Sequence, residues 1–316
     1  MSMAGAVARV VEWGWELRRS AYARGWRRPE RVGARVVSVG NLTLGGTGKT
    51  TLTRHLAGVL RERGRRVAVV CRRYHPGPAG EGDEERLLRE SLPGIPVLAG
   101  QSKLELARRA VGEGCDLVLV DDGFSHWPLE RDLDIVLVDG RTALEREALF
   151  PGGRLREPWR ALQRAQWVVL SRLDAGEDPG PRFAWLRRRA PGARFAAGRH
   201  AVCGVREARG SWLSGGARVR VVTATGNPGS VERTAREAGL EVVSASRYRD
   251  HHWFSADEAR REQQAADRSA SRVLLTAKDA VRWPEAAGPP PLVLEVAWEW
   301  VWGGAELERS AAGEDR

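Results

Sequence analysis

A glycine-rich run at residues 45–50, GGTGKT, has the residue types and spacing of a phosphate-binding loop. Its glycines let backbone N–H groups turn toward phosphates, Lys49 can reach the β- and γ-phosphates, and the Thr50 hydroxyl can bind Mg²⁺. The strict pattern has glycine at the position of Thr43, so the motif is slightly irregular. Because an apolar segment precedes the run and a helical pattern follows it, we predict a nucleoside triphosphate site at a helix N-terminus.

A second apolar run, residues 116–121, ends in two adjacent carboxylates, Asp121 and Asp122. Parallel strands share one carboxyl-terminal sheet edge, so we expect these side chains beside the phosphate loop, where a carboxylate can hold Mg²⁺ directly or through water. GTPases of this fold carry an Asn-Lys-x-Asp guanine signature. The nearest match here, TAKD at residues 276–279, has alanine in the asparagine position. The sequence therefore favours ATP with Mg²⁺.

A transferase also needs a group that deprotonates or orients the acceptor hydroxyl. The best candidate is the pair His251 and His252, which follows Asp250 in a predicted loop. Asp83, in a predicted loop after the second strand, could orient such a histidine. A surface histidine pair without catalytic role is the alternative interpretation.

Apolar runs alternate with helical patterns along the first part of the chain, which predicts a parallel sheet covered on both faces. Strands are expected at 35–40, 66–71, 96–99, 116–121, 134–139 and 166–171, and helices at 49–63 and 103–111. After a glycine-interrupted break within 195–218 the alternation resumes, with strands at 218–224, 240–245 and 272–276 and helices at 230–238 and 256–267.

The expected fold class is therefore α/β: a P-loop NTPase-like parallel sheet flanked by helices, with a second, smaller α/β lobe. We assign residues 31–200 to the nucleotide-binding domain and 201–316 to the smaller lobe. A last strand at 292–302 carries Trp298, Trp300 and Trp302 on one face, which indicates a buried face or a domain seam rather than a ligand platform. The tail after Gly303 is expected to be polar and frayed.

Residues 1–30 contain a predicted basic amphipathic helix at 4–24, with valines, Leu17, tryptophans and many arginines. It either lies on an anionic membrane or packs on the domain with its charges in water. The chain has 51 Lys+Arg against 41 Asp+Glu, a net charge of +10, which favours anionic partners. Only three of the basic residues are lysines, namely Lys49, Lys103 and Lys278. The three cysteines form no metal pair or disulfide framework, which is typical of a reducing cytosol.

The run at residues 37–50 (VSVGNLTLGGTGKT) resembles the P-loop of the tetraacyldisaccharide 4'-kinases, the lipid A 4'-kinases, in which threonine at 43 is the usual residue. Further segments match that family in order, at 71–74, 82–84, 121–126, 131–133, 138–140, 151–158, 226–228, 250–251 and 276–281. Four residues depart from the family pattern: Arg73 for glycine, Glu85 for proline, Ser125 for glutamine and Ala277 for glutamate. We interpret the chain as a divergent member.

The resemblance implies a P-loop kinase of lipid A biosynthesis, with two α/β lobes and an active cleft between them. It would transfer the γ-phosphate of ATP to the 4'-hydroxyl of a tetraacyldisaccharide 1-phosphate. Its place would be peripheral, on the cytoplasmic face of the bacterial inner membrane, reached through the N-terminal helix. The acylated disaccharide, ATP and the anionic membrane surface would be its partners, with no nucleic acid and no obligate protein partner.

The resemblance also assigns roles to residues. Asp83 and His251 would form a dyad that activates the sugar hydroxyl, and Lys49, Asp121 and Asp122 would complete the catalytic set. Thr50, Asp122 and Glu157 would hold the metal, and Arg72, His126 and Arg156 would lie near phosphates or the acceptor. The nucleotide would be bound by Thr43, Gly45, Gly46, Thr47, Gly48, Lys49, Thr50 and Thr51.

Two other functions compete with this one. A P-loop ATPase or GTPase acting as a metal-insertion or partner-switch protein would explain the nucleotide half, but not the Asp-His loop or the LREP stretch at residues 155–158. A nucleic-acid-binding protein is suggested only by the net charge, since no zinc pattern, helix-turn-helix or aromatic RNA-binding motif is present.

Overall fold

The computed structural model describes residues 3–73, 76–78, 80–174, 176–208, 210–213, 216–285 and 288–314. The chain forms two compact units. Unit 1 comprises Met1–Arg72, Leu92–His200 and Trp298–Arg316, and unit 2 comprises Arg73–Ser91 and Ala201–Ala297. The sequence led us to expect a single linear boundary near residue 200. Instead, residues 73–91 belong with the second unit and the last residues with the first.

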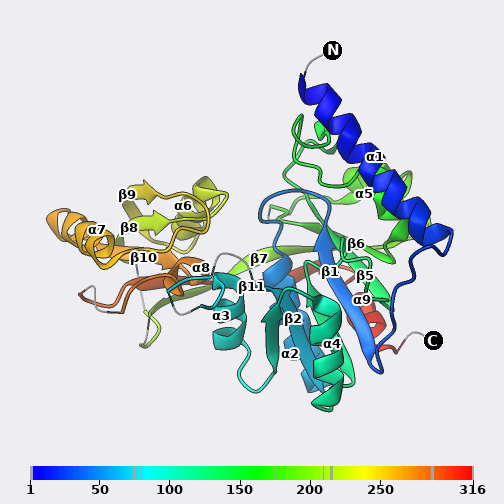
Figure 1. Ribbon diagram of the computed structural model, residues 1–316. Coiled ribbons are helices and arrows are strands. Elements are labelled where there is room, and N and C mark those ends of the chain that lie inside the picture. Colours follow the sequence, from blue (N-terminus) through cyan, green and yellow to red (C-terminus); the bar gives the residue numbers. More distant parts are fainter. Residues whose placement is uncertain are drawn as a thin grey trace. The chain divides into compact units, whose positions relative to one another are not determined.

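Unit 1 is built on a parallel sheet whose central strand is β1 (Arg35–Asn41), flanked by β4 (Leu117–Asp121) and β5 (Leu133–Asp139). The strand order is β3-β2-β4-β1-β5-β6-β7, with β2 at Val67–Arg72, β3 at Val97–Gly100, β6 at Trp167–Ser171 and β7 at Arg194–Glu207. Strands β1, β2, β5, β6 and β7 are labelled in Figure 1. All residues of β4 and β6 are buried. This burial explains why the strands are apolar on both faces and confirms the predicted parallel sheet.

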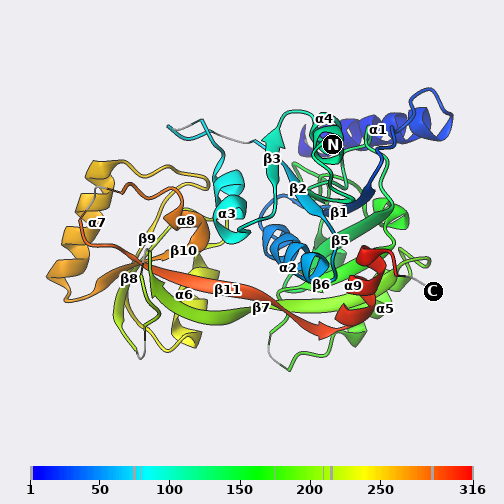
Figure 2. The same cartoon turned by 90° about the horizontal axis from the view of Figure 1, so that it is seen from below.

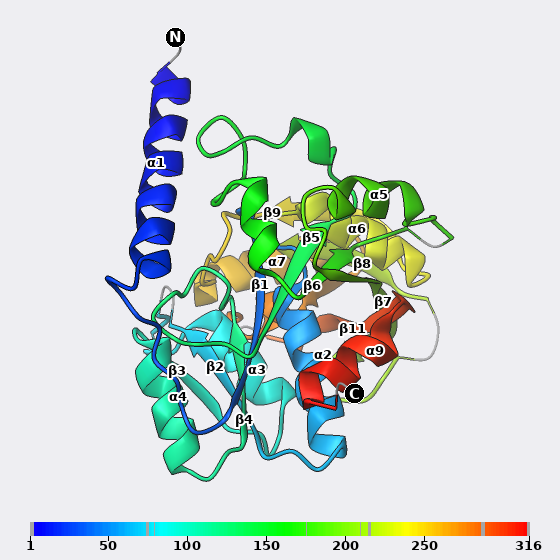
Figure 3. The ribbon, with the colours of Figure 1, turned by 90° about the vertical axis from the view of Figure 1, so that its right-hand side faces the viewer.

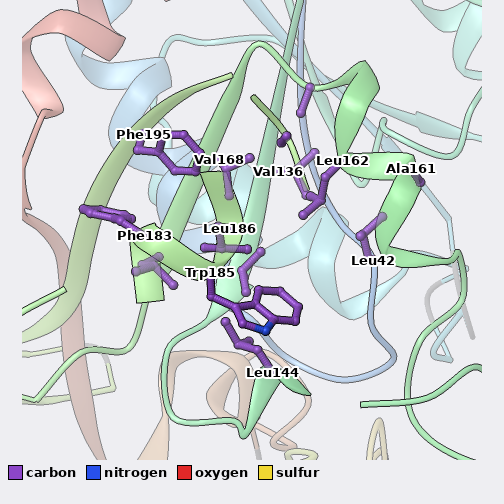
Figure 4. Packing of buried hydrophobic residues seen from close by; sticks show 14 of the residues in the cluster. Leu42, Val136, Leu144, Ala161, Leu162, Val168, Phe183, Trp185, Leu186 and Phe195 are labelled. Atoms are coloured by element: carbon purple, nitrogen blue, oxygen red, sulfur yellow. The ribbon is translucent and has the colours of Figure 1, made fainter. Parts of the chain in front are cut away.

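Helices cover this sheet: α2 (Lys49–Glu62), α4 (Lys103–Gly112), α5 (Gly180–Arg187) and α9 (Gly304–Ala312), with the 3-10 turns η1 (Leu144–Arg146) and η2 (Trp159–Arg164). One part of the core lies between α5, η2 and the sheet. There Phe183, Trp185 and Leu186 pack with Val168 and Phe195 (Figure 4).

The prediction of a frayed tail after Gly303 is wrong, because α9 packs beside α2 (Figures 2 and 3). Leu307 and Ala311, one helical turn apart, are fully buried. A short segment with several charged residues therefore still forms a packed helix.

The N-terminal helix α1 (Met3–Ala23) forms a long rod within unit 1 (Figure 3). Trp15 is buried, and the rings of Tyr22 and Trp127 pack in a tilted arrangement with centroids 5.2 Å apart, so one face of the helix packs on the domain. Val10, Trp13 and Leu17 are 67%, 68% and 52% exposed and form an apolar stripe on another face. Among the residues with a described position, no helix has the length and apolarity needed to span a membrane.

Unit 2 has the strand order β11-β10-β8-β9, and β10 (Arg272–Thr276) runs parallel to both of its neighbours. The other strands are β8 (Arg218–Thr223), β9 (Glu241–Arg247) and β11 (Leu292–Trp302), and the helices are α3 (Asp83–Ser91), α6 (Pro228–Glu237), α7 (Ala256–Arg268) and α8 (Ala277–Ala280). Helix α7 starts with a complete capping box formed by Ser255 and Glu258.

The break predicted within 195–218 is only partly right, because β7 continues to Glu207 through Gly198. A Cβ atom at Gly198 would lie 2.3 Å from the Trp298 ring, so this glycine permits a close contact and does not interrupt the strand. Trp298 is buried whereas Trp302 is 51% exposed, so the tryptophan face of β11 is buried at one end only.

Candidate active site

The phosphate loop connects β1 to α2, as the sequence predicts. Gly45 and Gly48 have φ angles of +97° and +90°, which only glycine adopts without strain. Gly48 gives α2 no side-chain cap, so the first N–H groups of the helix are left for a phosphate. The Asn41 side chain donates a hydrogen bond to the buried Thr47 hydroxyl (3.0 Å) and fixes the middle of the loop.

Residues from other parts of unit 1 also hold the phosphate loop in place. Thr43 forms an antiparallel bridge with Leu155, and the Leu44 N–H donates to the Arg154 carbonyl at 2.7 Å. The Gly46 carbonyl accepts a hydrogen bond from Arg172 (2.8 Å). Thr51, predicted to bind nucleotide, lies half-buried in the first turn of α2.

Asp121, at the end of β4, lies against the start of α2. Its carboxylate is buried and accepts hydrogen bonds from Thr53 (3.2 Å) and, more weakly, from Thr50 (3.4 Å). Thr50 and Asp121 thus offer a hydroxyl and a carboxylate oxygen to one position, the hard oxygen ligands that Mg²⁺ prefers.

Asp122 leaves the strand with φ +51°, so its side chain has other partners than that of Asp121. Its carboxylate lies 3.6 Å from the Lys49 ammonium and 2.9 Å from the Arg156 guanidinium. Burial alone would raise the pKa of Asp122, but the positive charges of Lys49 and Arg156 outweigh it and hold that pKa far below its usual range. The group is therefore ionised at neutral pH.

Sequence reasoning gave Lys103 no place in the site, although it is one of only three lysines. It is 5% exposed and donates to the carbonyls of Asp121 (2.8 Å) and Asp122 (2.5 Å), so it fixes the backbone turn that carries both carboxylates. Burial lowers the pKa of Lys103, and the neighbouring carboxylates partly oppose that shift. The scarcity of lysine in an arginine-rich chain was the signal that could have identified it.

Glu157 lies in a different set of contacts from Asp122. One oxygen accepts from Ser125 Oγ (2.6 Å), and the other accepts from Trp15 Nε1 (2.7 Å) and Arg164 (2.5 Å). Within the described ranges, no group of three or more His, Cys, Asp or Glu side chains is arranged to hold a metal ion. Mg²⁺ commonly takes only one or two protein carboxylates and completes its shell with phosphates and water. Glu157 as a metal ligand stays a prediction.

His126 follows the same turn. Burial, together with the positive charges of Lys103, Arg131 and Arg72, lowers the pKa of His126 to about 4, so the ring is neutral at pH 7. Arg131 donates to the His126 carbonyl at 2.6 Å. Arg72 ends β2 with an exposed side chain.

In unit 2, Asp83 and His251 meet. Asp83 Oδ2 lies 2.8 Å from His251 Nδ1. Asp83 is not in a loop, as the sequence suggested, but begins α3, because a run of acidic residues stabilises the first turn of a helix. Burial alone would raise the pKa of Asp83, yet the hydrogen bond with His251 and the charges of Lys278 and Arg282 outweigh it and lower the pKa. An ionised Asp83 can accept a hydrogen bond from an Nδ1–H group, an arrangement in which Nε2 is the ring nitrogen able to act as a base.

The dyad is held by residues of the motif matched at 276–281 and by Arg282, which follows that motif and was not singled out from the sequence. Arg282 is 2% exposed and lies 3.4 Å from Asp83 and 2.6 Å from Asp279. Asp279 in turn accepts from the Thr276 hydroxyl (2.7 Å). Lys278 Nζ lies 3.4 Å from His251 Nε2. The TAKD turn thus orders the dyad through Arg282. Tyr74, in one of the matched segments, lies outside the described residues.

Comparison with known proteins identifies one family over nearly the whole chain. Residues 5–310 match the family model described as tetraacyldisaccharide-1-P 4'-kinase. A tetraacyldisaccharide 4'-kinase from Anaeromyxobacter dehalogenans (strain 2CP-C) is 38% identical over 324 residues, covering 94% of this chain and 86% of the relative. One from Halothermothrix orenii is 32% identical over 303 residues, covering 84% and 79%.

Among solved structures, LpxK from Aquifex aeolicus in complex with ATP matches with a TM-score of 0.73 at 21% identity, over 96% of both chains. This match shows a shared fold, and it confirms the α/β fold class predicted from the sequence. With the family model and the curated relatives, it also confirms the predicted resemblance. The chain therefore belongs to the tetraacyldisaccharide-1-P 4'-kinase family.

Proposed function

We propose that this protein transfers the γ-phosphate of ATP to the 4'-hydroxyl of a tetraacylated glucosamine disaccharide 1-phosphate. The observation that carries the proposal is the Asp83–His251 pair, a carboxylate-oriented base, in a chain that also has a complete phosphate loop. A nucleotide-dependent switch protein needs the loop but has no use for a base that activates an acceptor hydroxyl.

In this proposal, residues 43–51 bind the nucleotide, and Lys49 contacts its β- and γ-phosphates. Thr50 with Asp121 or Asp122 would hold Mg²⁺, which when bound neutralises charge on the transferring phosphoryl group. Asp122 keeps Lys49 and Arg156 close to the loop. Positioning and charge stabilisation by these groups supply most of the catalysis of phosphoryl transfer.

The dyad acts on the acceptor. His251 Nε2 takes the proton of the sugar hydroxyl while the hydroxyl oxygen bonds to the γ-phosphorus and the bond to the ADP oxygen breaks. Asp83 stabilises the imidazolium that forms, and Arg282 holds Asp83 in place. Lys278 Nζ lies 3.4 Å from Nε2, on the side of the ring that would face the acceptor.

A substrate with four acyl chains stays in the membrane, so the enzyme must work at its surface. The exposed stripe of Val10, Trp13 and Leu17 on α1, together with nearby arginines, is suited to peripheral attachment to anionic lipid. We place the protein at the cytoplasmic face of the bacterial inner membrane, where ATP is available.

The test is transfer of labelled γ-phosphate from Mg·ATP to a tetraacyldisaccharide 1-phosphate in mixed micelles, with Lys49→Ala as control. We expect a phosphorylated lipid that depends on Lys49. ATP hydrolysis without lipid product, unchanged by the acceptor, would reject the kinase assignment in favour of a nucleotide switch.

A further inference from the structure

Glu157 is a buried carboxylate, 5% exposed, that receives hydrogen bonds from three separate parts of unit 1. Ser125 comes from the turn after Asp122, Arg164 from η2, and Trp15 from the N-terminal helix α1. The resemblance makes Glu157 a predicted metal ligand, and the hydrogen bond from the Trp15 indole is a contact that this predicted role does not explain, because α1 is otherwise the element proposed to face the membrane.

We infer that Trp15 is a positioning residue that holds Glu157, so that α1 orders the phosphate-transfer site in addition to facing the membrane. This inference rests on the proposed function. It assigns different roles to Trp13 and Trp15, which are only two positions apart in the sequence.

The environment of Trp15 differs from that of its neighbour on the helix. Trp15 is 8% exposed, whereas Trp13 is 68% exposed. The Arg160 guanidinium of η2 lies 5.2 Å from the centroid of the Trp15 ring and forms ion pairs with Glu12 (2.9 Å) and Glu16 (2.8 Å). The Trp15 face of α1 is thus docked on η2, and the face with Trp13 is free of that contact.

The contacts of the neighbouring residue, Arg156, connect Glu157 to the phosphate loop. The preceding residue, Arg156, pairs with the Asp122 carboxylate at 2.9 Å, and its N–H donates to the Leu42 carbonyl at 2.7 Å. The Arg156 side chain also contacts Asn41, at the end of β1. A shift of Glu157 therefore moves Arg156, and with it both Asp122 and the start of the loop.

The removal of one donor from a carboxylate that supports a metal or phosphate site typically lowers activity about 10–100-fold. We expect Trp15→Phe, which keeps an aromatic ring but removes the N–H donor, to reduce kcat by about 10-fold or more at saturating substrates. It should also raise the Mg²⁺ concentration needed for half-maximal rate. Binding to anionic vesicles should not change.

Trp13→Phe should weaken binding to anionic vesicles and leave kcat at saturating substrates unchanged. Trp212→Phe, at an exposed tryptophan of unit 2 outside both sites, serves as the neutral control. Circular dichroism at the assay temperature verifies that each variant is folded. A merely structural role for Trp15 would lower the folded fraction without changing the Mg²⁺ dependence.

A double-mutant cycle tests whether Trp15 affects kcat through Glu157. If Trp15 acts through Glu157, adding Trp15→Phe to Glu157→Gln should cause little further loss. A wild-type kcat in folded Trp15→Phe, or an equal loss in the Glu157→Gln background, would overturn the inference while leaving the kinase assignment intact. Absence of product from the unmodified chain would reject the proposed function, and this inference with it.

Discussion

At the scale of residues, Asp83 and His251 are 168 positions apart in sequence and form one hydrogen-bonded pair. The pair is surrounded by a buried network in which Asp279 holds Arg282 and Arg282 faces Asp83. The positive charge of Arg282 in this network helps to lower the pKa of Asp83 and so favours its ionised form beside the His251 ring.

His251→Ala should lower kcat by about 10²–10⁴-fold, the usual contribution of a general base, while the Kd for ATP stays unchanged. The matched control is His252→Ala, because the adjacent histidine pairs with Glu258 at 3.0 Å and has no role in the proposed chemistry. Unchanged turnover of His251→Ala would remove this residue from the mechanism.

The stability that Asp83 contributes to the fold should depend on pH. The folded protein lowers the pKa of Asp83 below its ordinary value of 3.8, so its ionised form stabilises the fold at pH above that value. This stabilisation is lost as the pH falls through the lowered pKa. We expect Asp83→Asn to reduce the free energy of unfolding by about 1–3 kcal/mol at pH 7. In urea titrations that difference should shrink toward pH 3. A pH-independent difference would contradict the ionised assignment.

At the scale of elements, two of the departures from the family pattern are in contact with each other. Arg73, just after β2, makes two hydrogen bonds to the fully buried carboxylate of Glu85 in α3, at 2.8 and 3.0 Å. Where the family pattern has glycine and proline, this chain has an ion pair that anchors the first turn of α3, which begins at Asp83. Glu85 also pairs with Arg89 at 2.8 Å.

This pairing predicts a coupled effect. Arg73→Gly should destabilise the protein and lower kcat, since it leaves a buried carboxylate with one fewer partner. Glu85→Pro in the same chain should restore both, with a coupling energy of about 0.5–3 kcal/mol from thermal unfolding of the two single variants and the double variant. Additive losses would show that the two departures are independent.

At the scale of the whole molecule, a net charge of +10 and an exposed apolar stripe on α1 support attachment to anionic membranes. Electrostatic attraction is screened over about 10 Å at ~0.1 M salt and about 3 Å at ~1 M. We expect co-sedimentation with anionic vesicles to fall steeply across this range, and Trp13→Glu to weaken it at every salt concentration. Salt-independent binding would assign attachment to the apolar stripe alone.

The sequence by itself determined the phosphate loop at residues 45–50, the carboxylates at the end of β4, most strands and helices, and the family. These features depend on residue types within short windows, where apolar runs, glycines and a Lys-Thr pair act locally. Only the tertiary structure decided that Lys103 holds the Asp121–Asp122 turn, that Arg282 holds Asp83, and that Trp15 reaches Glu157. It also decided that the polar-looking segment after Gly303 forms α9. Each of these contacts joins distant parts of the chain, and such pairings are set by the folded backbone, not by neighbouring residues.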